Sequence, residues 1–287
     1  MQGKAERAMR HGCQAVRRRV KGIATGMWRK DRVSATVPVE GSSRHDSMTA
    51  FDVRHYHELG STNDEARRLI ESGAPHGTVV HADQQTAGRG RFSRRWISPP
   101  GNLYVSIALR LGLPAARNLE LGFLAALAVA DAVDALLPRQ VRATLKWPND
   151  VLVRDGKIAG ILLEQAGDAL ILGIGLNVLH APSGVSYRVS TIVGCGGLAT
   201  VDGTREKLLD ALGRWLAIWE ADGFAAVRGA WLARAHPPGS SLGVRLADRF
   251  VTGLFIGIDT DGTLLLDTPQ GRARIVAGDV TVEAAAG

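Results

Sequence analysis

Cysteine is scarce in this sequence, and no long uninterrupted apolar run occurs. Cys13 and Cys195 are its two cysteines, too few for a disulfide framework, which excludes a disulfide-rich secreted scaffold and favours a reducing cytoplasm. The richest apolar stretch, Leu121 to Leu137, contains Asp131 and Asp134 at helical spacing and predicts a core helix, not a membrane span. Charges stand where a secretory signal would have its apolar segment, so we expect a cytoplasmic protein without membrane association.

The excess of positive charge is confined to the N-terminal segment. The 287 residues include 35 Lys+Arg and 28 Asp+Glu, and residues 1–48 hold 11 of the basic and 4 of the acidic ones, so residues 49–287 are neutral. Three interpretations of residues 1–48 remain open: a disordered extension, a nucleic-acid-binding arm around Arg17 to Arg19, or a mis-assigned start with Met48 as the first residue. No helix-turn-helix pattern occurs there, so we expect no DNA binding.

Residues 49–236 alternate strand and helix patterns, which predicts an α/β domain whose core the 45% hydrophobic content can supply. Thr62 and Glu65 have capping-box spacing, which predicts a helix that Gly73 closes. Further helices are expected at 119–137, 204–221 and 223–235, and strands at 51–57, 78–82, 103–109, 143–147, 151–153, 157–165 and 169–177.

The C-terminal residues change character after a linker signal. His236 to Gly239 reads His-Pro-Pro-Gly, and Pro-Pro favours extended backbone. Residues 239–284 contain short strand patterns separated by turns, at 242–247, 250–259, 263–267 and 273–282. This segment is therefore predicted to be a small all-β barrel.

The loop after the second expected strand is rich in glycine and arginine. Gln85 to Trp96 reads Gln-Thr-Ala-Gly-Arg-Gly-Arg-Phe-Ser-Arg-Arg-Trp, in which glycines let the backbone approach a ligand and the arginines can fork onto phosphates or a carboxylate. A solvated basic loop or an RNA-contacting patch explains the composition equally well. The flanking strand patterns favour an anion site inside a fold.

Two further motifs carry lysines close to strand ends. Lys146 to Asp150 reads Lys-Trp-Pro-Asn-Asp, in which Asp150 could hold Mg²⁺ and Asn149 could orient a polar ligand; the alternative is an ordinary turn. Lys157 enters an apolar strand and is one of three lysines in residues 49–287, although a solvated turn lysine is equally compatible. Gly173 and Gly175 leave one strand face bare, for a flat ligand or for close packing of another element.

These four motifs in this order resemble the biotin protein ligases, over the chain from about Tyr56 to the C-terminus. The resemblance rests on Gly-Arg-Gly-Arg with a downstream Trp96, on Lys-Trp-Pro-Asn-Asp, on Lys157 followed by Ala-Gly-Ile-Leu-Leu-Glu, and on Gly-Ile-Gly-Leu-Asn. It implies a mixed-sheet α/β catalytic domain with a small SH3-like C-terminal barrel, of the type without the repressor's helix-turn-helix. The loop departs from the family pattern, because Phe92 and Ser93 precede Arg94 where a second glycine is usual.

The resemblance also implies roles for particular residues. Those expected to bind biotin are Ser61, Thr62, Asn63, Gln85, Arg89, Gly90, Arg91, Lys157, Gly173 and Gly175. Those expected to bind ATP are Arg91, Arg94, Trp96, Lys146, Asn149 and Asn177, and Asp150 would lie near Mg²⁺. Lys157, Arg91 and Arg94 are the implied catalytic residues, since the reaction needs charge neutralisation more than a protein nucleophile.

The implied reaction joins biotin to ATP as biotinyl-5′-AMP and then transfers biotin to a lysine of a biotin carboxyl carrier protein, of acetyl-CoA carboxylase or a related carboxylase. Homodimers occur in the family. The alternatives are a lipoate or octanoate ligase of the same superfamily, an RNA-binding module built on the basic tail and loop, and a non-catalytic biotin-binding protein.

Overall fold

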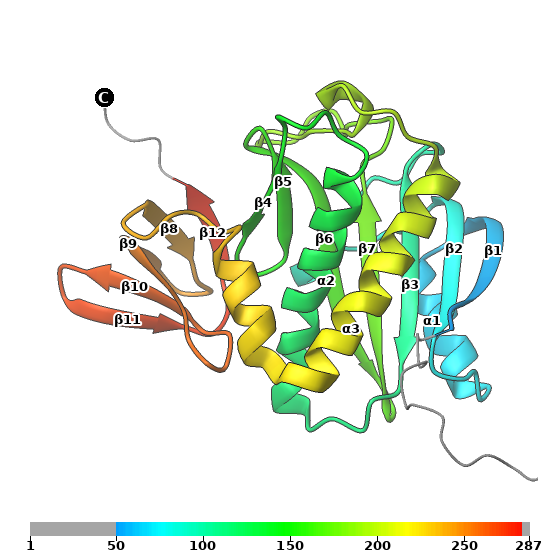
Figure 1. Ribbon diagram of the computed structural model, residues 1–287, viewed down its shortest axis with the longest axis horizontal. Helices are drawn as coiled ribbons and strands as arrows, with labels where there is room; N and C mark the ends of the chain where they lie inside the picture. The colour runs from blue at the N-terminus through cyan, green and yellow to red at the C-terminus, as the bar shows by residue number, and fades with distance from the viewer. Residues whose placement is uncertain (1–49, 283–287) are drawn as a thin grey trace, which may run out of the picture. The chain divides into compact units, whose positions relative to one another are not determined.

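Residues 50–282 of the computed structural model form two β-sheets and three α-helices, and the predictions for residues 1–48 lie outside this range (Figure 1). The helices are α1 (Thr62–Glu71), α2 (Asn118–Asp134) and α3 (Val201–Leu232). The strands of the larger sheet are β1 (Asp52–Leu59), β2 (Thr78–Gln85), β3 (Leu103–Leu109), β4 (Ala143–Lys146), β5 (Asp150–Val153), β6 (Gly156–Ala166) and β7 (Ala169–Leu176). Those of the smaller sheet are β8 (Ser241–Arg245), β9 (Phe250–Ile258), β10 (Leu264–Thr268), β11 (Gly271–Ile275) and β12 (Asp279–Val282).

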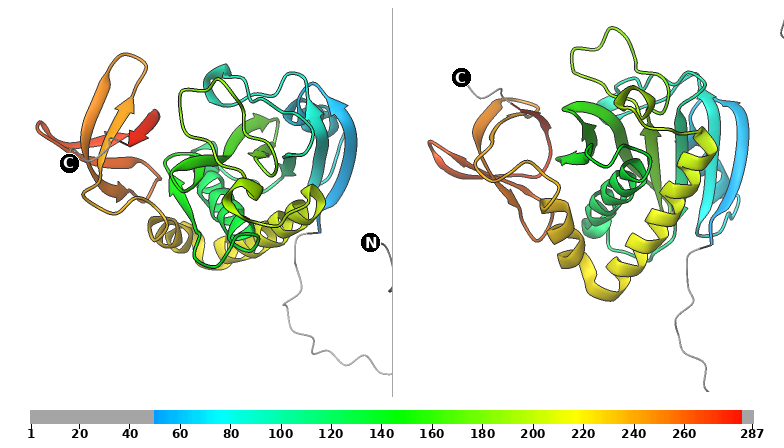
Figure 2. Two further views of the ribbon diagram at one scale, coloured as in Figure 1. Left: turned by 90° about the horizontal axis from the view of Figure 1, so that it is seen from above. Right: turned by 45° about the horizontal axis from the view of Figure 1, so that its top comes forward.

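The larger sheet is mixed, as the fold prediction requires. Its strand order is β1-β2-β3-β7-β6-β5-β4, with β1 and β2 parallel and the other neighbours antiparallel. Helices α2 and α3 cover one face, and α1 packs on the other (Figures 1 and 2). Nearly every residue of α2 from Leu121 to Val133 is buried, because the helix lies between the sheet and α3. Among residues 50–282, none of the helices combines the length and apolarity needed to cross a membrane.

Helix α3 bends where the sequence predicted a break between two helices. Gly223 has φ 72° and ψ −172°, which is not helical, and the chain changes direction there (Figure 1). A residue with a Cβ would be strained at this φ, whereas glycine adopts it freely. The prediction of two successive helices is confirmed in this sense.

The smaller sheet has the strand order β11-β10-β9-β8-β12, and every neighbouring pair is antiparallel. The prediction of a single strand over Ala273 to Val282 was wrong. Instead β11 pairs with β10 and β12 pairs with β8, so the chain crosses between opposite edges of the sheet at residues 276–278. Gly278 permits this crossing because a Cβ at this position would lie 2.6 Å from Val244 Cγ1.

Candidate functional site

The N-terminus of α1 presents polar groups to the ends of β2 and β3. Ser61 is the N-cap residue but makes no side-chain capping bond, and the backbone N–H of Thr62 donates instead to Gln85 Oε1 at 2.8 Å. The predicted capping box between Thr62 and Glu65 is wrong, because the Glu65 carboxylate accepts hydrogen bonds from Arg68. The polar side chains at the start of α1 therefore point into the protein, where Ser61 and Thr62 are buried.

Asn63 is buried over the bare backbone of β7. Its Oδ1 lies 2.6 Å from Ser106 Oγ on β3, which fixes the orientation of the amide. A Cβ at Gly173 would lie 2.3 Å from the same oxygen, so glycine is required for this approach. Asn63 Nδ2 is buried and has no hydrogen-bond partner among the residues that the structure describes. An unpaired buried donor is costly and marks a place where a ligand acceptor fits.

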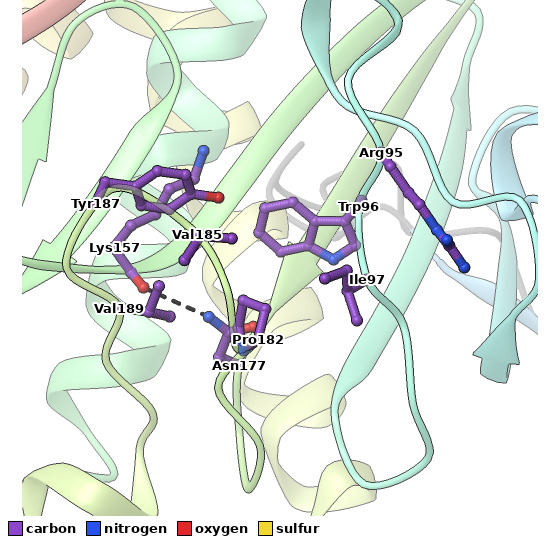
Figure 3. Close-up of a pocket in the computed structure, with 9 residues that line it drawn as sticks. All are labelled: Arg95, Trp96, Ile97, Lys157, Asn177, Pro182, Val185, Tyr187 and Val189. Atoms are coloured by element: carbon purple, nitrogen blue, oxygen red, sulfur yellow. Dashed lines mark hydrogen bonds between the residues drawn. The ribbon is translucent and has the colours of Figure 1, made fainter.

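Trp96 covers the next part of the same strand face. Its indole lies over the paired glycines Gly160 and Gly175, and a Cβ at Gly175 would be 2.4 Å from Trp96 Nε1. This nitrogen is a second buried donor without a partner. The indole therefore packs closely on part of the bare strand face. The cavity beside Trp96 is about 20 Å³, room for roughly one water molecule (Figure 3).

Two lysines converge on one carboxylate at the end of the sheet. Lys157 Nζ lies 2.6 Å from Asp150 Oδ1, and Lys146 Nζ lies 3.0 Å from Asp150 Oδ2. Burial by itself would raise the pKa of Asp150, but Lys157 and Lys146 together hold this pKa below its ordinary value. The ammonium of Lys157 also lies 5.4 Å from the centroid of the Trp96 ring. The cluster is thus two cations and one anion, with a net positive charge beside Trp96.

The arginine loop is anchored to α1 at its start and has an unusual backbone in its middle. Arg89 makes a two-pronged ion pair with Asp64, with both contacts at 2.6 Å, and this hydrogen bonding lowers the pKa of Asp64. Phe92 and Ser93 have φ values of 54° and 56°, in the left-handed region that favours glycine. The departure from the family pattern therefore falls on strained backbone, which costs about 1–2 kcal/mol per residue.

The two central arginines reach the smaller sheet. Arg91 Nη1 donates to Asn149 Oδ1 at 3.3 Å and to the carbonyl oxygen of Gly278 at 3.2 Å. Arg94 donates to Asp279 Oδ1 at 2.6 Å. Burial lowers the pKa of Arg91, and the Asp279 carboxylate opposes that effect. The loop, the end of β4 and the start of β12 thus meet at one place.

Asn177 lies at the end of β7 and is buried, and its side chain holds neighbouring backbone. Its Nδ2 lies 3.4 Å from the carbonyl oxygen of Lys157 and 3.3 Å from that of Ser190 (Figure 3). Asn177 lines the small cavity beside Trp96 together with Lys157. Arg95 also borders this cavity but points away from the indole (Figure 3).

The structure therefore brings the predicted residues together in two groups on the α1 face of the sheet. The first surrounds Asn63 and consists of Ser61, Thr62, Asn63, Gln85, Gly173 and Gly175. The second is cationic and consists of Arg91, Arg94, Lys146, Asn149, Asp150 and Lys157. Trp96 lies between them and Arg89 beside α1. A ligand with a hydrogen-bond acceptor at one end and an anionic group at the other matches this arrangement.

Three contributors were missed by sequence reasoning. Ser106 orients Asn63, and its signal was a polar residue inside the otherwise apolar strand Leu103–Leu109. The loop between β7 and α3 lines the cavity with Pro182, Val185 and Tyr187, and its length of more than 20 residues was the available signal. Asp279 had none, because its contact with Arg94 joins residues 185 positions apart.

Comparisons with known proteins point to one family. The Biotin/lipoate A/B protein ligase family matches residues 59–179, and the Biotin protein ligase C terminal domain matches residues 243–282. The chain is 39% identical to a biotin–[acetyl-CoA-carboxylase] ligase of Paracoccus denitrificans, over 77% of this chain and 96% of the relative. A Mycobacterium tuberculosis protein of the same name is 36% identical, over 78% of this chain and 86% of the relative. The solved biotin protein ligase from Aquifex aeolicus, in complex with biotin and ATP, superposes with a TM-score of 0.71 at 30% identity, covering 81% of this chain and 98% of that one.

Proposed function

This chain belongs to the biotin protein ligases, and from that premise we propose that its site forms biotinyl-5′-AMP and then biotinylates a carrier protein. In the first step a biotin carboxylate oxygen attacks the α-phosphorus of ATP and pyrophosphate leaves. In the second step a lysine amine of the carrier attacks the acyl carbon, loses a proton, and AMP leaves. Both steps depend on positioning and on neutralising charge, not on a protein nucleophile.

The observation that carries this proposal is the pair of buried, unpartnered donors beside a cationic cluster. Asn63 Nδ2 and Trp96 Nε1 have no acceptor among residues 50–282, and Lys157 Nζ lies 5.4 Å from the centroid of the Trp96 ring. Biotin has a neutral ureido carbonyl that accepts hydrogen bonds and a carboxylate at the end of its chain. Its two ends therefore match the two halves of the site.

Roles follow for the predicted residues. The group around Asn63 would hold the biotin rings: Ser61, Thr62, Asn63, Gln85, Gly173 and Gly175, with Arg89 and Gly90 from the loop. Lys157, Arg91 and Arg94 would neutralise the carboxylate and the phosphates, and Trp96, Lys146, Asn149 and Asn177 would line the nucleotide side. Trp96 has to move if biotin is to contact Gly175, because its indole lies directly on that glycine.

The surroundings of Asp150 do not fit a Mg²⁺ site. Both of its carboxylate oxygens contact lysine ammonium groups, and no second carboxylate accompanies it in the ion pairs of this cluster. Mg²⁺ prefers several oxygen ligands and retains bound waters. We therefore derive no step through a metal ion on Asp150. Its role in this proposal is to position the two lysines.

The proposed acceptor is a biotin carboxyl carrier protein of acetyl-CoA carboxylase or a related carboxylase, because both relatives are named as ligases of acetyl-CoA carboxylase. Its lysine has to reach the acyl carbon from solvent, so it should lie on an exposed turn. We place the reaction in the cytoplasm, where ATP is available.

The test is biotin-dependent release of pyrophosphate from ATP without a carrier. The wild type should release pyrophosphate with biotin but not with lipoate or octanoate, and Lys157→Ala should lower the rate at least about 100-fold. Lys207→Ala is the matched control, because this lysine is exposed on α3 outside the site. Release with lipoate or octanoate alone would move the chain to the other branch of the superfamily. Tight biotin binding without any release would instead indicate a non-catalytic biotin-binding protein.

A further inference from the structure

Three histidines and an aspartate gather on the edge of the larger sheet, on the face opposite to the proposed biotin site. In the parallel pair of β1 and β2, His55 is the register partner of His81. His57 and Asp83 follow two residues later on their strands and therefore point to the same side. Val79 packs in the core beneath α2 and α3, and alternation places His81 on that face.

Contacts link the four side chains in a row, from His57 through Asp83 and His55 to His81. His55 Nε2 lies 2.7 Å from Asp83 Oδ1, and His57 Nδ1 lies 3.2 Å from Asp83 Oδ2. The rings of His55 and His81 stack with their centroids 4.8 Å apart. One donor atom from each of His55, His81 and Asp83 lies within 4.8 Å of the other two. With bonds of about 2.0–2.2 Å, two ligands of one zinc ion lie at most about 4.4 Å apart, so these side chains have to draw slightly closer when an ion binds.

His81 gives a second, independent indication. The residue is 1% exposed, and its buried Nε2 has no hydrogen-bond partner within the described part of the chain. Its other ring nitrogen, Nδ1, lies 3.1 Å from Arg205 Nη1 on the first turn of α3. A buried imidazole nitrogen without a partner is rare and costly in folded proteins. Because Arg205 can only donate, Nδ1 is the acceptor and Nε2 carries the ring proton. A metal ion therefore binds Nε2 once that proton has moved to Nδ1 and Arg205 has released the ring.

We propose that His55, His57, His81 and Asp83 form a binding site for a divalent transition-metal ion such as Zn²⁺, Co²⁺ or Ni²⁺. Imidazole nitrogens with one carboxylate suit these borderline ions, whereas Mg²⁺ and Ca²⁺ prefer sets of oxygen ligands. Neither biotin nor ATP is needed to fill the site, and the proposal does not depend on the ligase function.

Because the site lies on two neighbouring strands, a bound ion should stabilise the edge of the sheet. β1 is an edge strand, bonded only to β2 within the sheet of residues 50–282, and its end leads directly into Ser61. An ion held by two residues of β1 and two of β2 would cross-link the strands. Arg205 opposes the ion with its positive charge, and its ion pair with Asp202 at 2.5 Å gives it an alternative partner once the metal binds.

The experiment is a titration of the metal-free full-length chain with Co²⁺, followed by the visible absorption of the bound ion. We expect one equivalent to bind with the spectrum of nitrogen ligation, and an excess of Zn²⁺ to raise the thermal midpoint by roughly 5 °C. Mg²⁺ should produce no shift. His55→Gln and Asp83→Asn should each weaken Co²⁺ binding at least about tenfold, since each removes one ligand. Both side chains are partly exposed, so these variants should fold where a change at the buried His81 would not.

Two further variants separate this site from other histidines. His180→Gln is the matched control, because His180 is exposed on the loop after β7 and outside the cluster, and it should leave Co²⁺ affinity unchanged. Arg205→Gln should tighten binding by removing the opposing charge. Co²⁺ binding of equal strength in wild type, His55→Gln and Asp83→Asn would assign the ion to histidines elsewhere in the chain and overturn the proposal. Absence of saturable binding to the wild type would overturn it as well.

Discussion

At the scale of single residues, Asp150 decides how the cationic half of the site is held. Lys146 and Lys157 would repel each other in a partly buried position, and the carboxylate between them removes that repulsion. A buried ion pair contributes little net stability because both partners lose hydration, but breaking it leaves an unpaired charge. Asp150 therefore fixes where Lys157 points without taking part in bond formation.

Asp150→Asn should consequently affect both stability and rate. We expect the free energy of unfolding to fall by about 3 kcal/mol, since two ammonium groups lose their counter-charge while shape is preserved. Biotin-dependent pyrophosphate release should also fall, because Lys157 is no longer held in place. Urea unfolding and the pyrophosphate assay measure the two effects. Asp155→Asn, at an exposed turn, is the control and should change stability by no more than about 0.5 kcal/mol. Equal stability of the two variants would contradict the bridging role.

Gly173 has to be glycine because any side chain at this position would collide with Asn63. An added Cβ would lie 2.3 Å from Asn63 Oδ1, and Asn63 cannot withdraw without losing its 2.6 Å contact with Ser106. We expect Gly173→Ala to raise the KM for biotin about tenfold and to destabilise the fold by about 1–3 kcal/mol. Gly229→Ala is the control: nothing lies within 4 Å of its added Cβ, and helix propensity predicts up to about 1 kcal/mol of stabilisation. An unchanged KM in Gly173→Ala would remove Asn63 from the biotin pocket.

At the scale of elements, the arginine loop combines fixed ends with a strained centre. Arg89 is tied to α1 by its ion pair with Asp64, and the N–H of Trp96 donates to the carbonyl oxygen of Gly88 at 2.9 Å. Between them Phe92 is 65% exposed, and the guanidinium of Arg91 lies 4.9 Å from its ring centroid. The sequence predicted a ligand-binding loop here, but its backbone depends on these contacts and could not be inferred from composition.

Arg91 is the residue of this loop that we expect to shield the adenylate. Its guanidinium bonds to Asn149 and to the Gly278 carbonyl, so it closes the gap between the loop, β4 and β12. Arg91→Gly should open that gap and release biotinyl-5′-AMP, which then acylates lysines of bystander proteins. Blotting for biotin with serum albumin added to the reaction detects this. Arg95→Gly makes the same change in the same loop where the side chain points away from the site (Figure 3). Labelling confined to the carrier in Arg91→Gly would contradict the shielding role.

Across the whole described region, hydrophobic periodicity sufficed for most elements, because burial against a single large core sets the period of each strand and helix. It failed at Ala273 to Val282, where an apolar pattern continues through a crossing that only pairing with β8 and β10 reveals. The site, too, could be predicted only in part from the sequence. Glycine and lysine motifs marked its residues, whereas the contact between Arg94 and Asp279 depends on how the smaller sheet packs against the loop.

From that contact we predict that the smaller sheet helps to position the arginines for ATP. Asp279 lies 2.6 Å from Arg94 and 4.0 Å from Arg91, so one carboxylate holds both guanidinium groups in place before ATP arrives. We expect Asp279→Asn to raise the KM for ATP about tenfold while the KM for biotin stays the same, because preorganisation is lost only on the phosphate side. Asp248→Asn is the control, since Asp248 is exposed in the turn between β8 and β9 and pairs with its neighbour Arg249.

The sign of the change in KM separates two roles for this carboxylate. If Asp279 instead competed with phosphate for the arginines, its removal would lower the KM for ATP, whereas preorganisation predicts that its removal raises this KM. Salt does not separate the two roles, because it screens the attraction of ATP for the arginines as well as their ion pairs with Asp279. Measuring the KM for ATP of the wild type and of Asp279→Asn at one fixed ionic strength therefore tests whether the smaller sheet aligns the arginine loop or restrains it.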